Sequence, residues 1–131
     1  MVVPNRGDAA GIGNPHWVIE VPDPATVDLG RVGPVLEHDP RFPARVNVEF
    51  AVVEAEDRVR MRVWERGAGE TQSCGTGACA AVVAAAEWAH EETPVRYDLE
   101  VPGGRLVITW TGDTVLLAGP AVIVAEGETS L

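Results

Sequence analysis

The sequence contains few cysteines, few basic residues and no long apolar run. Its only two cysteines, Cys74 and Cys79, lack a CxxC spacing, and its three histidines are scattered, which argues against a metal site of the zinc type. The 10 Lys and Arg residues stand against 20 Asp and Glu residues, and a net charge of −10 disfavours binding to a nucleic acid backbone. No apolar stretch reaches the roughly 18 residues of a transmembrane helix, so we expect no membrane contact.

The N-terminus carries no basic segment followed by an apolar stretch, so we expect no signal peptide and a cytoplasmic location. Both thiols would be reduced there, and they lie on one expected helix, poorly placed to pair with each other. A chain of 131 residues with 46% hydrophobic residues can bury one core. We therefore expect a single domain over residues 1–131.

Short apolar runs separated by proline and glycine predict strands. Residues 58–65 alternate cleanly, with Val59, Met61 and Val63 on one face, and the turn before them indicates a hairpin with residues 47–55. The other expected strands are residues 16–21, 95–101, 105–110, 114–119 and 121–127.

Residues 78–91 are rich in alanine, the strongest helix former, and the helix they predict is apolar on nearly every side. Such a helix is buried all round. One further helical turn is expected around residues 29–36, within a segment rich in helix breakers. The expected fold class is therefore α+β: a curved, mostly antiparallel, barrel-like sheet of six or seven strands wrapped around one central buried helix.

Cys74 stands directly before a Gly-Thr-Gly sequence at the start of that helix. The unpaired N–H groups of a helix start attract an anion, Gly75 and Gly77 permit close approach, and Thr76 adds a hydroxyl donor. These residues suit a carboxylate, and the same field would lower the pKa of the Cys74 thiol and make it a base. An ordinary helix entry with a buried, apolar cysteine explains the motif about equally well.

Two polar clusters accompany this motif. Glu65 and Arg66 end the alternating strand, where a carboxylate can bind an ammonium group and a guanidinium a second carboxylate, although such pairs are more often solvated. Asn14 and His16 flank a proline, and Asn47 opens the next strand; turn and strand-edge roles are the plain alternatives for these three.

Four segments, in this order, closely resemble the C-terminal half of diaminopimelate epimerase: GNPHWVI, FPARVNVEF, RVWERGAGETQSCGTGACAAVVA and VPGGRLVITW. The similarity runs from about Gly11 to about Gly127. It implies interconversion of LL- and meso-diaminopimelate, in lysine and peptidoglycan-precursor biosynthesis, without pyridoxal phosphate or metal. In this family two cysteines face each other across the α-carbon, one from each half of the protein.

The resemblance also implies roles for single residues. Cys74 matches the catalytic cysteine of the second half, Glu65 the residue that contacts the α-ammonium group, and His16 a histidine beside the catalytic pair. Gly75 and Thr76 match the amides that hold the α-carboxylate. The residues that match those recognising the distal end of diaminopimelate are Asn14, Asn47 and Arg66. Cys79 is expected to pack in the core.

The N-terminal half of the family's proteins, with its CGNG-type motif and opposing cysteine, is not in this chain. Racemisation needs bases on opposite faces of a planar carbanion, and one thiol exchanges a proton on one face only. We therefore expect the isolated chain to lack useful epimerase activity and to take the missing N-terminal half as its partner. The surface that would face this half can be apolar, which favours a homodimer of the isolated chain.

Two alternatives remain open from the residues. One is another cofactor-independent racemase or isomerase of the same fold, such as a relative of proline racemase or of the phenazine-pathway isomerases. Arg66, Asn14 and Asn47 argue for a ligand with a second polar end, which proline lacks. The other alternative is a non-catalytic binding or assembly domain that keeps an old pocket.

Overall fold

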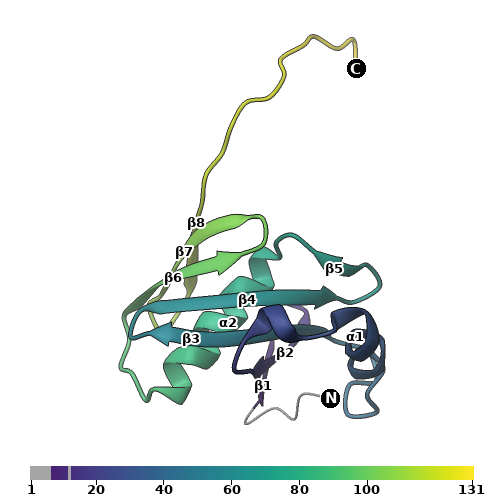
Figure 1. Ribbon diagram of the computed structural model, residues 1–131. Coiled ribbons are helices and arrows are strands. Elements are labelled where there is room, and N and C mark those ends of the chain that lie inside the picture. The colour runs from purple at the N-terminus through teal and green to yellow at the C-terminus, as the bar shows by residue number, and fades with distance from the viewer. Residues whose placement is uncertain (1–6, 12) are drawn as a thin grey trace.

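The strands form one curled, mixed sheet that wraps around helix α2 (Figure 1). The computed structural model describes residues 7–11 and 13–131, the first of these ranges by its backbone alone. In sheet order, the strands are β1 (Gly7–Gly11), β2 (Pro15–Glu20), β3 (Asn47–Ala55), β4 (Arg58–Glu65), β6 (Val95–Val101), β7 (Gly104–Trp110) and β8 (Val115–Ala118), and β5 (Gly69–Thr71) pairs with β4 off this path. The helices are the 3-10 turn η1 (Pro24–Thr26), α1 (Leu29–Glu37) and α2 (Gly75–Trp88).

Most strand pairings are antiparallel, and the two parallel ones, β2 with β3 and β4 with β6, are each bridged by a helix. Parallel neighbours need a crossover connection, which α1 supplies for the first pair and α2 for the second. The expected fold class, a curved and mostly antiparallel sheet around one buried helix, is confirmed.

Helix α2 is buried on almost every side, as its composition predicts. The buried residues are nine of its 14, and most of them are alanines. Small side chains let the concave face of the sheet approach closely, and Val18, Met61, Leu99 and Ile108 pack against the helix. Cys79 belongs to the same cluster, as expected of a core residue.

The period of two along β3 divides its side chains between the two faces of the sheet. Val48 and Phe50 belong to a second apolar cluster, which also includes Leu29 of α1. Ala51 packs in the cluster around α2. Asn47 and Glu49 share the alternation of Ala51, so two polar residues stand in the row that faces the central helix.

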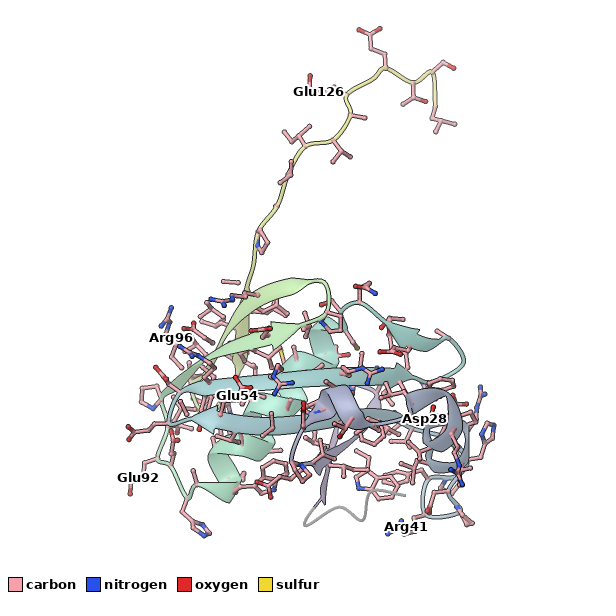
Figure 2. The ribbon with its side chains drawn as sticks, viewed as in Figure 1. Asp28, Arg41, Glu54, Glu92, Arg96 and Glu126 are labelled. Atoms are coloured by element: carbon pink, nitrogen blue, oxygen red, sulfur yellow. The ribbon has the colours of Figure 1, made fainter. Side chains whose placement is uncertain are left out.

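The expected strand over residues 121–127 is wrong. After β8, residues 119–131 form no helix or strand and lead away from the sheet (Figure 1). Val122, Ile123 and Val124 are 81%, 78% and 92% exposed, and Glu126 lies far from the body of the domain (Figure 2). Strand propensity reflects fit against neighbouring strands, and among the described residues no sheet edge pairs with this segment.

Other differences concern short elements and boundaries. Strands β1 and β5 were not expected, because the sequence GDAAG of β1 has no apolar alternation and β5 has only three residues. Helix α2 begins three residues before the expected residue 78, at Gly75, and ends at Trp88. Over the described ranges, none of the helices has both the length and the apolar character that crossing a membrane requires.

Candidate active site

Cys74 is the N-cap residue of α2, where the sequence places it. Its backbone is extended, with φ −136° and ψ 111°, and its Sγ accepts a hydrogen bond from the Gly77 N–H at 3.4 Å. The Thr76 hydroxyl lies 3.6 Å from the same sulfur. Gly75 and Thr76 are the first two residues of the helix, so their backbone N–H groups have no partner within it. The helix start therefore offers two amide donors beside a thiol.

The expectation of a lowered Cys74 pKa is wrong for this chain. Burial raises the pKa of the Cys74 thiol, because its residue is only 8% exposed and a thiolate there loses hydration. Hydrogen bonds from Thr76 and Gly77 oppose this shift in the pKa, whereas the charges of Glu65 and Glu49 reinforce it. The thiol is accordingly held in its protonated form, in spite of the helix start.

Glu65 lies at the end of β4, where β5 folds back on it with Gly69 as its register partner. The Thr71 hydroxyl of β5 donates a hydrogen bond to Glu65 Oε2. Burial is the main cause of the raised Cys74 pKa, and the charge of Glu65 raises this pKa further, so Glu65 lies within electrostatic range of the sulfur. Sequence reasoning did not find Thr71, because nothing in the short sequence GET marks it as a strand that returns to Glu65.

Asn47 ties the start of β3 to the residue after β4. Its Oδ1 accepts from the Arg66 backbone N–H at 2.8 Å, and its Nδ2 donates to the Pro15 carbonyl at 3.0 Å. The Arg66 guanidinium donates through Nη1 to the Ala44 carbonyl at 3.1 Å. In this structure both ends of the Asn47 amide therefore form hydrogen bonds with backbone groups. The Arg66 guanidinium has further N–H donors besides the one that binds Ala44.

Glu37, at the end of α1, anchors the loop that follows Glu65. This carboxylate is buried and accepts hydrogen bonds from Trp64 Nε1 and the Gly67 N–H, both at 3.1 Å. Arg45 Nη1 donates to its second oxygen at 3.2 Å. Gly33 of α1 has no room for a Cβ, which would lie 2.3 Å from the Trp64 ring. The position of the Glu65–Arg66 segment thus depends on α1.

His16, at the start of β2, is fully buried and bonded on both sides. Its Nδ1 lies 2.7 Å from Glu49 Oε1, and its Nε2 lies 2.9 Å from Asn14 Oδ1. His16 is also the register partner of Asn47. Sequence reasoning missed Glu49, although its position in an otherwise apolar strand, in register with the core residue Ala51, is a signal that it faces α2.

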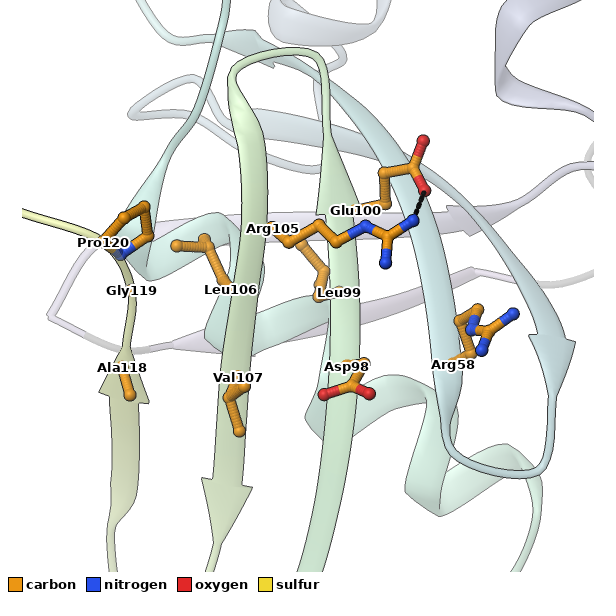
Figure 3. Close-up of a pocket in the computed structure, with 10 residues that line it drawn as sticks. All are labelled: Arg58, Asp98, Leu99, Glu100, Arg105, Leu106, Val107, Ala118, Gly119 and Pro120. Atoms are coloured by element: carbon orange, nitrogen blue, oxygen red, sulfur yellow. Dashed lines mark ion pairs between the residues drawn. The ribbon is translucent and has the colours of Figure 1, made fainter.

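The predicted residues therefore converge on one end of the sheet. The starts of β2 and β3 carry His16 and Asn47, the end of β4 carries Glu65, and Cys74 begins α2 beside them. A cavity of about 450 Å³ lies elsewhere, on β6, β7 and β8, where Asp98, Glu100 and Arg105 line it (Figure 3). Among the side chains that the structure describes, no cluster of three from His, Cys, Asp or Glu suits a metal ion.

The fold and the site define a curled-sheet domain with a cysteine at the mouth of its enclosed helix. Two solved structures of similar fold are phenazine biosynthesis proteins of the PhzF family. The one from Enterococcus faecalis has a TM-score of 0.57 and 14% identity over 78% of this chain and 36% of that one. The one from Bacillus anthracis has a TM-score of 0.53 and 21% identity over 79% and 33%. At such identities the likeness concerns the fold alone.

The family model of diaminopimelate epimerase matches residues 9–129, and the chain belongs to this family. The diaminopimelate epimerases of Pseudomonas fluorescens (strain Pf0-1) and Pseudomonas entomophila are both 54% identical to it over 125 residues. The enzyme of Azotobacter vinelandii is 53% identical over the same length. These matches cover 94% of this chain but 45% of each relative, so the chain spans about half the length of these proteins.

Proposed function

We propose that this chain supplies one of the two half-sites of a diaminopimelate epimerase. Cys74 exchanges the α-proton on one face of the substrate, and a cysteine of the N-terminal half serves the opposite face. The observation that carries the proposal is the position of Cys74: its sulfur caps α2 next to the amides of Gly75 and Thr76, within electrostatic reach of Glu65. The reaction uses neither pyridoxal phosphate nor a metal ion.

The charges around the site support a role for each end of the substrate. The amides of Gly75 and Thr76 receive the α-carboxylate, since a helix start favours an anion. Glu65 receives the α-ammonium group, and Thr71 holds its carboxylate in place. Asn14, Asn47 and Arg66 recognise the distal carboxylate and ammonium group of the substrate. Of these three, Arg66 is supported by its further N–H donors, and Asn47 acts by holding the Arg66 backbone.

The protonated state of Cys74 fits a two-base exchange. A thiol that keeps its proton is ready to donate it to a carbanion on its own face. Burial is the largest cause of the raised Cys74 pKa, and the charge of Glu65 adds to it. The ammonium group of a substrate at Glu65 offsets this added charge. Substrate binding then favours the thiolate, so that the same sulfur also acts as a base in the reverse direction.

The surface near the site supports a partner domain. Leu117 of β8 is 45% exposed, and its Cδ1 lies 3.5 Å from where a Cβ on Gly75 would stand. An exposed apolar side chain at the mouth of a site suits the N-terminal half, and a second copy of the chain can cover it when that half is missing. The pathway is lysine and peptidoglycan-precursor biosynthesis in the cytoplasm.

A complementation assay tests the proposal. The chain is mixed with the N-terminal half of the Pseudomonas fluorescens relative in D2O, and deuterium at the α-carbon of LL-diaminopimelate and formation of the meso isomer are followed by NMR. We expect both signals with the two halves together and no meso isomer with either alone. Cys74→Ala abolishes turnover, and Cys79→Ala, the matched control, retains it. Turnover by the Cys74→Ala variant, or by the isolated chain, contradicts the proposal.

A further inference from the structure

Glu49 is the one acidic residue of β3 that is completely buried. Its Oε1 contacts His16, whereas its Oε2 has no hydrogen-bond partner among the described residues. A buried carboxylate oxygen without a partner costs free energy, so its retention in the core calls for a reason. The proposed function gives Glu49 no role, although it lies among the residues of the candidate active site, next to Cys74.

Glycine at position 77 makes room for this carboxylate against the start of α2. A Cβ added to Gly77 would lie 2.6 Å from Glu49 Oε1 and 3.3 Å from Cys74 Sγ. The carboxylate and the sulfur therefore pack against the same point of the first helical turn. The charge of Glu49 adds to the effect of burial in raising the Cys74 pKa, so a change in that charge alters this pKa.

The contacts of His16 determine where its protons lie. Asn14 Oδ1 is an acceptor, so Nε2 must carry a hydrogen and donate it. Nδ1 and Glu49 Oε1 then share a second proton, which lies either on the ring, as an imidazolium–carboxylate pair, or on the carboxyl group, as a neutral pair. Both arrangements have the same total charge of zero.

Loss of the shared proton reverses the outer bond. The neutral ring then donates through Nδ1 to the Glu49 carboxylate, and Nε2 becomes an acceptor. Asn14 can satisfy it only by turning its amide, so that the NH2 group faces the ring and Oδ1 faces outward. The protonation of a buried pair thus selects which end of the half-buried Asn14 amide is available to a ligand.

We propose that Glu49 is a positioning residue: through the proton it shares with His16, it orients the Asn14 amide so that the NH2 group is the end offered to a ligand. That group binds an acceptor oxygen, as a carboxylate provides, and rejects an ammonium group. The identity of the ligand as diaminopimelate rests on the proposed function, whereas the orientation of Asn14 does not.

The groups that face Glu49 all act on this equilibrium. Burial raises the pKa of Glu49 to about 7, His16 of β2 lowers this pKa, and the charge of Glu65 at the end of β4 raises it. Cys74 faces it from the start of α2. The shared proton is therefore retained in the acidic range and is lost as the pH rises through about 7.

NMR on the 15N- and 13C-labelled chain tests the proposal without any substrate. Two-bond 1H–15N spectra report which ring nitrogen of His16 carries hydrogen, and the Glu49 carboxyl carbon reports its titration. At about pH 6, where Glu49 with its pKa of about 7 still keeps the shared proton, we expect hydrogen on Nε2. As the Glu49 carboxyl carbon titrates, hydrogen should leave Nε2 and remain on Nδ1. An Nε2 that lacks hydrogen at about pH 6, or that keeps it after Glu49 has titrated, overturns the proposal even if no variant folds.

Glu49→Gln adds a second measurement. It removes the carboxyl group that holds the shared proton, so the change in the His16 ring signals that accompanies the Glu49 titration should be absent. Glu87→Gln changes the same charge at an exposed position of α2 and should retain that change. Amide spectra of both variants confirm that they fold. The same change in the His16 ring signals in Glu49→Gln and the wild type overturns the proposal.

Turnover with the N-terminal half separates the two proposals. If the wild type converts diaminopimelate, its KM should rise about tenfold as the pH increases above about 7, with a smaller effect on kcat, because loss of the shared proton turns the Asn14 NH2 group away from the ligand. Glu49→Gln has no proton to lose here, so its KM should not show this rise. The same rise in Glu49→Gln, or no rise in the wild type, overturns the positioning role and leaves the epimerase half-site intact. Absence of wild-type turnover contradicts the proposed function, and the NMR result still decides the orientation of Asn14.

Discussion

The sulfur of Cys74 accepts a hydrogen bond from the Gly77 N–H at 3.4 Å, so the proposed catalytic thiol also caps the central helix. One atom therefore serves the stability of α2 and the chemistry at its mouth. The same first turn carries Gly75 and Thr76, whose amides remain for a ligand. Substitutions at this position must be judged for both effects.

Cys74→Ala should lower the free energy of unfolding by about 1 kcal/mol, since it removes an N-cap acceptor. Cys74→Ser keeps an acceptor of the preferred N-cap type, so its free energy of unfolding should lie within about 0.5 kcal/mol of that of the wild type. Urea unfolding followed by circular dichroism measures both. A Ser variant as unstable as the Ala variant would show that the sulfur contributes by packing and not as a cap.

Gly77→Ala should destabilise the fold by about 1–3 kcal/mol, because the new methyl group would lie 2.6 Å from Glu49 Oε1 in a packed site. Gly30→Ala is the matched control. At Gly30 of α1 the nearest neighbour of a Cβ is Asp28 Oδ1 at 3.8 Å, and alanine should stabilise the helix by up to about 1 kcal/mol. The midpoint temperatures of thermal unfolding should shift in opposite directions in the two variants. A shift in the same direction would show that the residues around Gly77 can move to make room for a methyl group.

Glu49 makes the stability depend on pH in a definite direction. Burial raises the pKa of Glu49 from 4.5 to about 7, so the folded protein holds this proton more tightly than the unfolded chain. The stabilising contribution is complete below about pH 4.5 and is lost as the pH rises through about 7.

Glu49→Gln cannot lose a proton, so its unfolding free energy should fall less than that of the wild type over this range, by an amount on the order of 1–3 kcal/mol. Urea midpoints at about pH 5 and pH 8 compare the two proteins, with Glu87→Gln as the control for a lost surface charge. Parallel profiles for the wild type and Glu49→Gln would contradict the raised pKa.

Removal of residues 121–131 should leave the free energy of unfolding within about 0.5 kcal/mol of the full chain, because this segment belongs to no sheet and Val122–Val124 are exposed. The truncated chain should also associate less, since exposed apolar side chains are lost. Urea unfolding and sedimentation measure the two effects. A loss of more than about 1 kcal/mol would mean that the segment packs on the domain in solution.

Local patterns in the sequence determined much of this protein. The alternation of Arg58–Glu65 and the alanine-rich run of α2 predict their structures because both periods depend on neighbouring residues alone. The glycines after Cys74 mark a helix start for the same reason. The four segments that resemble the family also lie entirely within the match of its family model to residues 9–129.

Tertiary structure decided what depends on residues far apart in the chain. The pKa of Cys74 rises instead of falling, because burial and the carboxylates of Glu65 and Glu49 outweigh the helix start, and no local pattern contains those distances. Residues 121–127 have the composition of a strand but lack a neighbouring edge. Glu49 pairs with His16, 33 residues away in sequence, only because the parallel pairing of β2 and β3 brings them together. Periodicity assigns a residue to a face of an element, whereas packing alone decides which charges share that face and how much water remains around them.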